Sequence, residues 1–303
     1  MSVQHNLPPS VTKRPITASY RTGGTALDQE RPVALVLGTG DIPSAIGRTL
    51  FLQGWGIVLL RDSTVPVLRR GMAFDDALET GAADLDGVAA TAASGPETLP
   101  ALAMAGDGVV VANLDLAVAS ASCPGLATVL IDARMRKYAL QADLRPLAPC
   151  TVGIGPGFVA SGNVHVAIET LPGQEGAVVT HGPTAIPTGK AEPLGGAGAE
   201  RFVYASAAGA WQPHVPLGAR ISRGTTIGLL DGGQVLAPID GCVRGLGRAA
   251  PGGVSRGSKL VEIDPRPEAA WRGVPVRAQR IAIGVKTVLS ALTPVGTEPV
   301  QLV

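Results

Sequence analysis

Two glycine-rich turns, each following a short hydrophobic run, are the parts of this sequence most suited to binding chemistry. In LVLGTGDIPSAIGRTL, Gly38 and Gly40 separate an apolar run from a segment with helical spacing. A dinucleotide-binding turn has the pattern G-x-G-x-x-G, whose glycines allow a tight turn, close approach to pyrophosphate and helix–strand packing. Pro43 stands at the third glycine position, where it suits the first turn of a helix but not close packing. Two interpretations stay open, a phosphate- or nucleotide-binding turn and a purely structural turn.

Charged residues near this turn add to the first interpretation. A helix beginning at Asp41, behind Gly40, would offer free N–H groups and a positive dipole end to an anion. Asp62 follows the next hydrophobic run, where a dinucleotide-binding fold has an acidic residue for the ribose. Arg61 beside it would suit a phosphate on that ribose. The expected ligand is therefore a phosphate-bearing molecule such as a nucleotide or NAD(P).

The second turn, GIGPGF, contains Gly155 and Gly157 and also follows a hydrophobic run. Asp132 ends another such run. Loops at the carboxyl ends of parallel strands converge on one crevice. We therefore expect the backbone amides around 38–43 and 155–157 to meet in one anion-receptive pocket, with Asp132 nearby.

His165 and Glu169, in NVHVAIET, are the candidate catalytic residues. They would share a face whether the segment is a helix, as positions i and i+4, or a strand, in which side chains alternate. His165 could act as a general base or a ligand, and the alternative is a structural histidine. No metal-ligand spacing and no Ser/His/Asp set accompanies them.

The elements that must position these residues form an α/β pattern in the first half of the chain. Short β-branched runs alternate with helical or loop segments, which indicates a Rossmann-like parallel sheet. Residues 172–200 have the composition of a long loop. We predict a loose arm over 1–30, the α/β domain over 31–200, a small all-β domain over 201–270, and over 271–303 a C-terminal helix that returns to the α/β domain. Strands are expected within 32–37, 56–60, 107–115, 126–134, 150–158, 201–206, 226–233, 234–246 and 258–264, and a short helix over 74–81.

Composition excludes several classes of protein. A net charge of +1 and 3% aromatic residues argue against nucleic acid or a membrane surface as partner. No 18-residue apolar run and no secretory signal occur, so a cytoplasmic protein is expected. Cys123, Cys150 and Cys242 are isolated and are expected to be buried or half-buried thiols.

The stretch 209–265 resembles a biotinyl/lipoyl-type domain, a flattened barrel of two half-repeats. PLGARISRGTTIGLL parallels APGGVSRGSKLVEI, and VLAPIDGCVRGL is similar to the hairpin of the second half. A carrier domain needs a lysine at its hairpin tip, and the tip region LLDGGQVLAP has none. The resemblance therefore implies a lysine-free barrel over 201–270, without the carrier lysine, with no biotin or lipoate and a role in packing or partner contact.

Most of residues 33–290 resembles the accessory proteins of selenium-dependent molybdenum hydroxylase systems, which are distantly akin to xanthine dehydrogenase maturation factors. The most specific part is GIGPGF with NVHVAIET, and the other matching pieces are LVLGTGDIPSAIGRTLFLQGWGIVLL, VPVLRRGMAFDDALETGAADLDGVAA, LIDARMRK and EPLGG. The positions carried over by this resemblance are Gly38, Gly40, Asp41, Asp132, Gly155, Gly157, His165 and Glu169.

The resemblance implies a factor that matures a molybdenum-cofactor hydroxylase, with a hydroxylase subunit as partner and the pterin dinucleotide as ligand in the crevice. The scattered cysteines do not indicate a selenium or sulfur relay. One alternative is an enzyme that uses NAD(P) or a nucleotide, and another is a non-catalytic scaffold whose β domain docks a hydroxylase subunit. The oligomeric state is left open.

Overall fold

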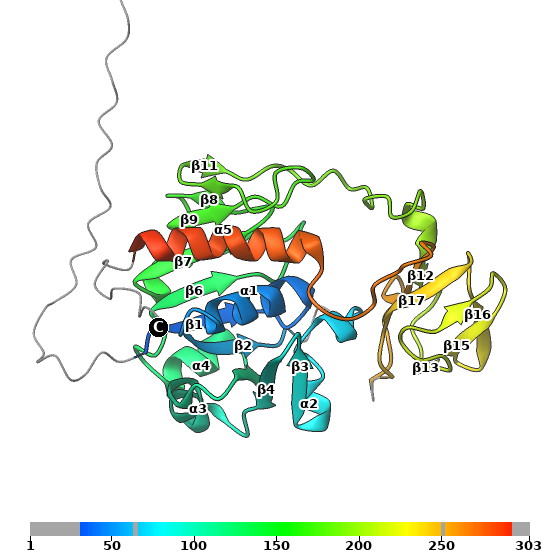
Figure 1. The fold of residues 1–303 in the computed structure, drawn as a ribbon, viewed down its shortest axis with the longest axis horizontal. Coiled ribbons are helices and arrows are strands. Elements are labelled where there is room, and N and C mark those ends of the chain that lie inside the picture. Colours follow the sequence, from blue (N-terminus) through cyan, green and yellow to red (C-terminus); the bar gives the residue numbers. More distant parts are fainter. Residues whose placement is uncertain (1–30, 63–65, 250–251, 293–303) are drawn as a thin grey trace, which may run out of the picture. The chain divides into compact units, whose positions relative to one another are not determined.

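A nine-stranded sheet forms the centre of the computed structural model, which describes residues 31–62, 66–249 and 252–292 (Figure 1). The predicted arm over 1–30 lies outside the described residues. The strand order is β10-β9-β7-β6-β1-β2-β5-β4-β3. The bounds are β1 Val33–Leu37, β2 Gly56–Leu60, β3 Ala82–Leu85, β4 Val88–Ala92, β5 Val109–Ala112, β6 Val129–Asp132, β7 Cys150–Ile154, β9 Val166–Ile168 and β10 Val178–Val179.

The sheet is parallel except at its two edges. The edge strands β3 and β10 pair antiparallel with β4 and β9, and the other neighbours pair in parallel. From β1 the chain first builds the β2–β5 side and then crosses to β6 on the other side. The fold is therefore α/β with a mostly parallel sheet, and the strand order reverses between β1 and β6. Ligands of such sheets bind outside the carboxyl ends of the strands at this switch point.

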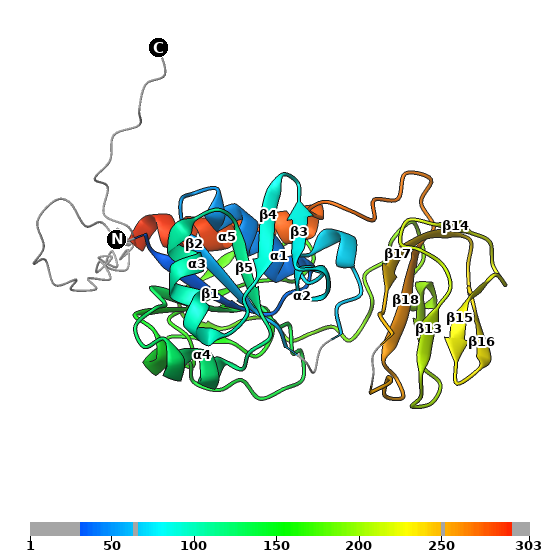
Figure 2. The same ribbon diagram turned by 90° about the horizontal axis from the view of Figure 1, so that it is seen from below.

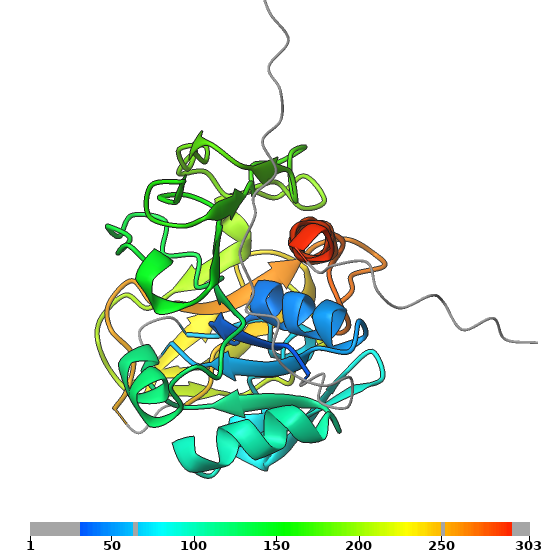
Figure 3. The same ribbon diagram turned by 90° about the vertical axis from the view of Figure 1, so that its left-hand side faces the viewer.

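Helices cover both faces of the sheet. On one face, α1 (Asp41–Phe51) packs along α5 (Val276–Leu292), and Figure 3 shows α5 end-on beside α1. On the other face lie α3 (Leu99–Ala105) and α4 (Leu116–Ser122). Residues of β1 alternate between the two cores: Ala34 and Val36 face α1 and α5, whereas Leu35 faces the other core. The continuous apolar runs of the sequence follow from this burial on both sides.

The first glycine turn connects β1 to α1. Gly40 is the N-cap of α1, and Pro43 occupies the first turn of the helix, where its missing N–H costs nothing. The close packing of the helix against the strand, which the third glycine of a dinucleotide-binding turn allows, occurs here at Gly47 instead of Pro43. A Cβ atom on Gly47 would lie 3.1 Å from Ile57 and 3.2 Å from Leu59 of β2. The packing glycine is thus displaced by one helical turn.

Residues 201–264 form a second, smaller structure, here called the β module (Figure 2). Two antiparallel sheets share one hydrophobic core that includes the buried Trp211. One sheet contains β12 (Phe202–Tyr204), β18 (Lys259–Asp264), β17 (Gly241–Leu246) and β14 (Arg220–Ile221), and the other contains β13 (Trp211–Pro213), β15 (Thr226–Leu230) and β16 (Gly233–Leu236).

One correction concerns lysine in the β module. Asp231 and Gly232 form the tip between β15 and β16, so no lysine stands there. The predicted span is nevertheless not free of lysine, because Lys259 opens β18. Its position is at the start of a strand rather than at a hairpin tip, so it cannot serve as the carrier lysine of such a domain.

Short elements complete the described chain. They are α2 (Ala77–Thr80), the two-stranded pair β8 (Val159–Ala160) and β11 (Gly182–Pro183), and the 3-10 turns η1 (Arg70–Met72), η2 (Pro96–Thr98), η3 (Arg145–Leu147) and η4 (Ala199–Arg201). Most of the segment 172–200 is loop, as its composition predicts.

Candidate functional site

A cavity of about 590 Å³ lies at the carboxyl edge of the parallel strands. Its walls include the start of α1, the loops after β6, β7 and β9, the start of α5, and part of the β module. Its volume falls within the range of about 300–1,000 Å³ typical of small-molecule sites. The cavity lies beside the switch point, where this class of sheet binds ligands.

The two glycine turns contribute to this cavity through their neighbours. Asp41 and Ile42 line it from the first turn, and Pro156 lines it from the second. The residues Gly38, Gly155 and Gly157 have φ values of +106°, +81° and +90°, which favour glycine. These turns thus shape the walls, although the glycines themselves do not line the cavity.

The start of α1 already holds a negative charge. The Asp41 carboxylate stands in the first turn, near the positive dipole end, and pairs with Arg69 Nη1 at 2.7 Å. This ion pair partly satisfies the helix terminus. A ligand anion would therefore depend on the other cations of the cavity more than on the glycine turn.

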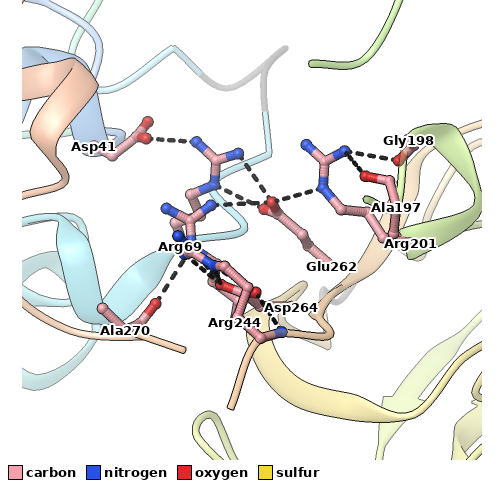
Figure 4. A network of polar contacts seen from close by, with 10 residues as sticks. Asp41, Arg69, Ala197, Gly198, Arg201, Arg244, Glu262, Asp264 and Ala270 are labelled. Atoms are coloured by element: carbon pink, nitrogen blue, oxygen red, sulfur yellow. Dashed lines mark hydrogen bonds and ion pairs between the residues drawn. The ribbon is translucent and has the colours of Figure 1, made fainter. Parts of the chain in front are cut away.

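Arg69 also connects the α/β part to the β module (Figure 4). Its Nε donates to Glu262 Oε2 at 2.7 Å, and Arg201 and Arg244 approach Glu262 Oε1 at 3.4 and 3.1 Å. Burial would raise the pKa of Glu262, but the charges of Arg69, Arg244 and Arg201 lower it to about 2. Glu262 is thus held ionised and neutralises part of this arginine cluster.

Two lysines of the cavity, Lys137 and Lys259, have no such counterion. Within the part of the chain that the structure describes, neither ammonium group has a hydrogen-bond or ion-pair partner, and Lys259 Nζ lies 4.1 Å from the centre of the Phe202 ring. Partial burial, together with the charges of Arg277 and Arg69, lowers the pKa of Lys137. Partial burial also lowers the pKa of Lys259, and Arg69, Lys137 and Arg201 add to the effect against the attraction of Glu262.

Positive side chains outnumber negative ones around the cavity. Three of the five lining carboxylates already have partners, because Asp41 pairs with Arg69, Glu175 with Arg280, and Glu169 with backbone amides. The cavity therefore has a positive potential suited to an anionic ligand. The basic lining residues are Arg69, Lys137, Lys190, Arg201, Arg244, Lys259, Arg266, Arg272, Arg277 and Arg280, and the acidic ones are Asp41, Glu169, Glu175, Glu192 and Glu268.

The structure does not bring the two predicted catalytic residues together. His165 precedes β9 and Glu169 follows it, so they lie at opposite ends of the strand, about 13 Å apart at 3.3 Å per residue. His165 is at the amino edge, where its Nδ1 accepts from the Thr151 backbone N–H at 3.1 Å. Burial and the charge of Arg145 lower its pKa against the effect of Asp143, which favours the neutral ring. His165 is therefore outside the cavity that Glu169 lines, and a shared catalytic role for the two residues stays a prediction.

Glu169 lines the cavity, but its carboxylate is occupied. Oε1 accepts from the backbone N–H groups of Thr170 and Leu171 at 2.5 and 2.8 Å, and Oε2 accepts from Ala185 N–H at 2.7 Å. The side chain is buried. These contacts fix the loop after β9 to the segment at 185, which is a structural role rather than that of a free general base.

The other two predicted carboxylates are also engaged in local ion pairs. Asp62 pairs with Arg136 Nε at 2.7 Å, and its side chain is 6% exposed. Asp132 accepts from Arg134 Nε and Nη2 at 2.9 and 2.5 Å. Arg61, considered for a ribose phosphate, binds Asp75 and Glu79 instead. None of these side chains lines the cavity, so the ribose-binding role expected of Asp62 has no support in its surroundings.

Sequence reasoning missed the cations that dominate the cavity. Arg69, Lys137, Lys259 and Arg277 come from four separate segments, and no motif links them. Two of them lie in stretches on which the family resemblance depends, Arg69 in VPVLRRGMAFDDALETGAADLDGVAA and Lys137 in LIDARMRK, but the resemblance gives neither residue a role. Single basic residues in loops are ordinary surface features, so their convergence is visible only in the fold.

Metal and thiol chemistry have no visible site in the described ranges. Among the residues of 31–62, 66–249 and 252–292, no group of three or more His, Cys, Asp and Glu side chains is placed to hold a metal ion. Cys123, Cys150 and Cys242 are free, and burial raises the pKa of each, that of Cys150 to about 11. Their thiols are thus poor nucleophiles.

In the same ranges, no helix is long and apolar enough to span a bilayer.

Comparison with known proteins gives one curated relative. The chain is 30% identical over 291 residues to the uncharacterized protein YqeB of Escherichia coli strain K12, covering 91% of this chain and 51% of that protein. The chain therefore spans about half the length of the relative it matches. No protein-family model matches the chain. Among solved structures, a succinylglutamate desuccinylase/aspartoacylase from Rhodobacter sphaeroides has 16% identity and a TM-score of 0.24, over 77% of this chain and 86% of that one.

Proposed function

We propose that this protein binds a phosphate-bearing small molecule in the cavity and acts as an accessory factor in the maturation of a molybdenum-cofactor hydroxylase. The observation that carries the binding proposal is the excess of cations at the carboxyl edge of the sheet. Among the described residues, five of these cations have no carboxylate partner, namely Lys137, Lys190, Lys259, Arg272 and Arg277. Lysine and arginine side chains in a concave site are the groups that bind phosphate.

The link to molybdenum hydroxylases depends on the family resemblance of residues 33–290. In this proposal the pterin dinucleotide of the client enzyme is the cargo, and its pyrophosphate would meet the basic wall of the cavity. The hydroxylase subunit is the proposed protein partner. We interpret the α/β part as Rossmann-like, because its strand order reverses beside β1, and the β module as biotinyl/lipoyl-like without a carrier lysine.

The surroundings of the candidate residues favour binding over catalysis. The candidate base His165 lies at the opposite edge of the sheet, and the Glu169 carboxylate accepts three backbone hydrogen bonds. Asp62, proposed for a ribose, pairs with Arg136. We therefore favour a binding protein over an NAD(P)-dependent enzyme.

Calorimetric titration of the full chain with CMP, AMP, NADP⁺ and the isolated pterin dinucleotide cofactor tests the proposal. Binding of at least one phosphate compound, weakened by added salt, is expected, because screening reduces charge–charge attraction. If none of the four compounds gives a heat of binding or changes the unfolding temperature of the protein, the proposal of a phosphate-bearing ligand is refuted. Co-purification with a molybdenum hydroxylase subunit tests the second half of the proposal independently.

A further inference from the structure

Two of the cavity lysines without counterions come from different parts of the fold. Lys137 lies in the loop after β6 of the α/β part, whereas Lys259 opens β18 of the β module. Both line the same cavity. The charge of Arg69 contributes to lowering the pKa of each lysine. The charge of Lys137 also acts on Lys259. The α/β part and the β module thus each contribute one of these lysines to the same cavity.

The other cations nearby are largely neutralised within the protein. Arg69 pairs with Asp41 and Glu262, and Arg201 and Arg244 share the carboxylate of Glu262. Arg277 uses Nη2 to donate to the Thr170 carbonyl at 2.9 Å. Like charges held close together repel one another unless an anion lies between them. Among the described residues, Lys137 and Lys259 have no hydrogen-bond or ion-pair partner for their ammonium groups. The same holds for the side chains of Lys190 and of Arg272, which stacks on Trp271.

The side chain of Lys259 is held in place by an aromatic ring. Its ammonium group lies over the face of Phe202, a residue that also lines the cavity, and Arg201 stacks on the same ring at 4.3 Å. A cation over an aromatic face is held by the ring quadrupole, which leaves its N–H donors free for another partner. Phe202 thus presents Lys259 to the cavity without neutralising it.

We propose that Lys137 and Lys259 together bind the two phosphoryl groups of an organic diphosphate, so that the β module supplies half of the binding site. This inference rests on the proposed function, because it names the ligand class and the residues of the same cavity. Two point charges that line one cavity fit two linked phosphates better than one. The β module is then a wall of the site rather than a docking appendage.

Titration of the full chain with inorganic pyrophosphate and with inorganic phosphate tests this inference, followed by ADP against AMP and CDP against CMP. The wild-type protein should bind each diphosphate at least about tenfold more tightly than its monophosphate, since a charge-assisted contact is added. Lys137→Gln and Lys259→Gln should each weaken diphosphate binding about tenfold or more and reduce the preference for diphosphates.

Lys286→Gln is the matched control, because Lys286 lies in α5 and is not part of the cavity wall. It should bind pyrophosphate like the wild type, and circular dichroism should show all three variants folded. If the wild type binds phosphates but Lys259→Gln binds diphosphates unchanged, or if mono- and diphosphates bind equally, the inference is refuted while the proposed function stands. If the wild type binds no phosphate compound, both are refuted.

Discussion

Two groups of charges contain residues of both the α/β part and the β module, and they differ in whether the charges are paired within the protein. In the first, Asp75 is almost fully buried and accepts from Thr39 Oγ1 at 2.5 Å, from Arg61 Nε at 2.9 Å and from Arg248 of the β module. In the second, Lys137 and Lys259 face the cavity without an anion. The Asp75 group therefore stabilises the contact between the two parts, whereas the two lysines await a ligand anion in our proposal.

The Asp75 group also explains why the first glycine turn has its shape. Thr39 stands between the two glycines of the turn, and its hydroxyl donates to Asp75. Burial would raise the pKa of Asp75, but hydrogen bonds from Arg61, Thr39 and Arg248 lower it. The turn is thus tied to a carboxylate of the protein, while the anion proposed as ligand lies among the lysines.

The largest expected effect is that of Asp75→Ala. The substitution leaves Arg61 and Arg248 without their buried carboxylate, which typically destabilises a fold by about 3–5 kcal/mol. Urea unfolding measures the loss. Glu79→Gln is the matched control, because Glu79 also pairs with Arg61 but is exposed, and it should cost about 1 kcal/mol or less. Equal losses for the two variants would contradict the distinction between the groups.

The pH dependence of stability depends on Glu262. Its pKa falls from the ordinary value of 4.5 to about 2 in the folded protein. A carboxylate with a lowered pKa stabilises the fold above its unfolded pKa and loses this contribution as the pH falls. Between pH 5 and pH 2 the free energy of unfolding should therefore decrease by about 3 kcal/mol from this group.

Glu262→Gln isolates that contribution. The variant is expected to be less stable than the wild type at pH 7, and the difference should shrink as the pH approaches 2. Denaturant unfolding at several pH values measures it. A difference that stays constant over this range would show that the ionised form of Glu262 does not stabilise the arginine cluster.

A smaller effect is expected for ligand affinity at alkaline pH. Partial burial, followed by the charges of Arg277 and Arg69, lowers the pKa of Lys137 below the ordinary lysine value of 10.5. Partial burial also lowers the pKa of Lys259, and the charges of Arg69, Lys137 and Arg201 add to this against the attraction of Glu262. Pyrophosphate affinity should fall as the pH rises toward the ordinary lysine value, because the binding cations are lost. Calorimetric titration checks this, and Lys137→Gln/Lys259→Gln should have a flatter profile. Identical profiles would place the titrating groups elsewhere.

The smallest effect is predicted for His165→Ala. The histidine lies at the amino edge, away from the cavity, so pyrophosphate affinity should stay within about twofold of the wild type. Stability should decrease by about 1 kcal/mol, because the hydrogen bonds between the imidazole Nδ1 and Thr151 are lost. Titration and thermal unfolding of the same sample separate the two readouts. A tenfold loss of affinity would restore His165 as a site residue.

Much of the sheet could be predicted from the sequence, because buried parallel strands form uninterrupted β-branched runs. The runs at 32–37 and 56–60 correspond to β1 and β2 within one residue. The hairpin of β3 and β4 was not predicted. Its sequence, AADLDGVAATA, is built largely from alanine and has alternating exposed positions, so it lacks a strong strand signal despite its Asp86-Gly87 turn.

The site was less predictable because its chemistry comes from long-range contacts. The glycine turns indicated the correct edge of the sheet, since Asp41, Ile42 and Pro156 line one cavity. The carboxylates that were singled out, Glu169 and Asp132, are instead taken up by nearby amide or guanidinium groups. Lys137 and Lys259 are more than a hundred positions apart in the sequence, and nothing local marks them as neighbours.

The order of elements along the chain sets a constraint on biosynthesis. Ile281, Ala282 and Val285 of α5 complete the hydrophobic layer over α1 and the sheet, yet they are translated only after the whole β module. Until then, apolar side chains of that layer, such as Ile46, have no cover from α5. The nascent α/β part must therefore wait for the β module to emerge before its own core can close.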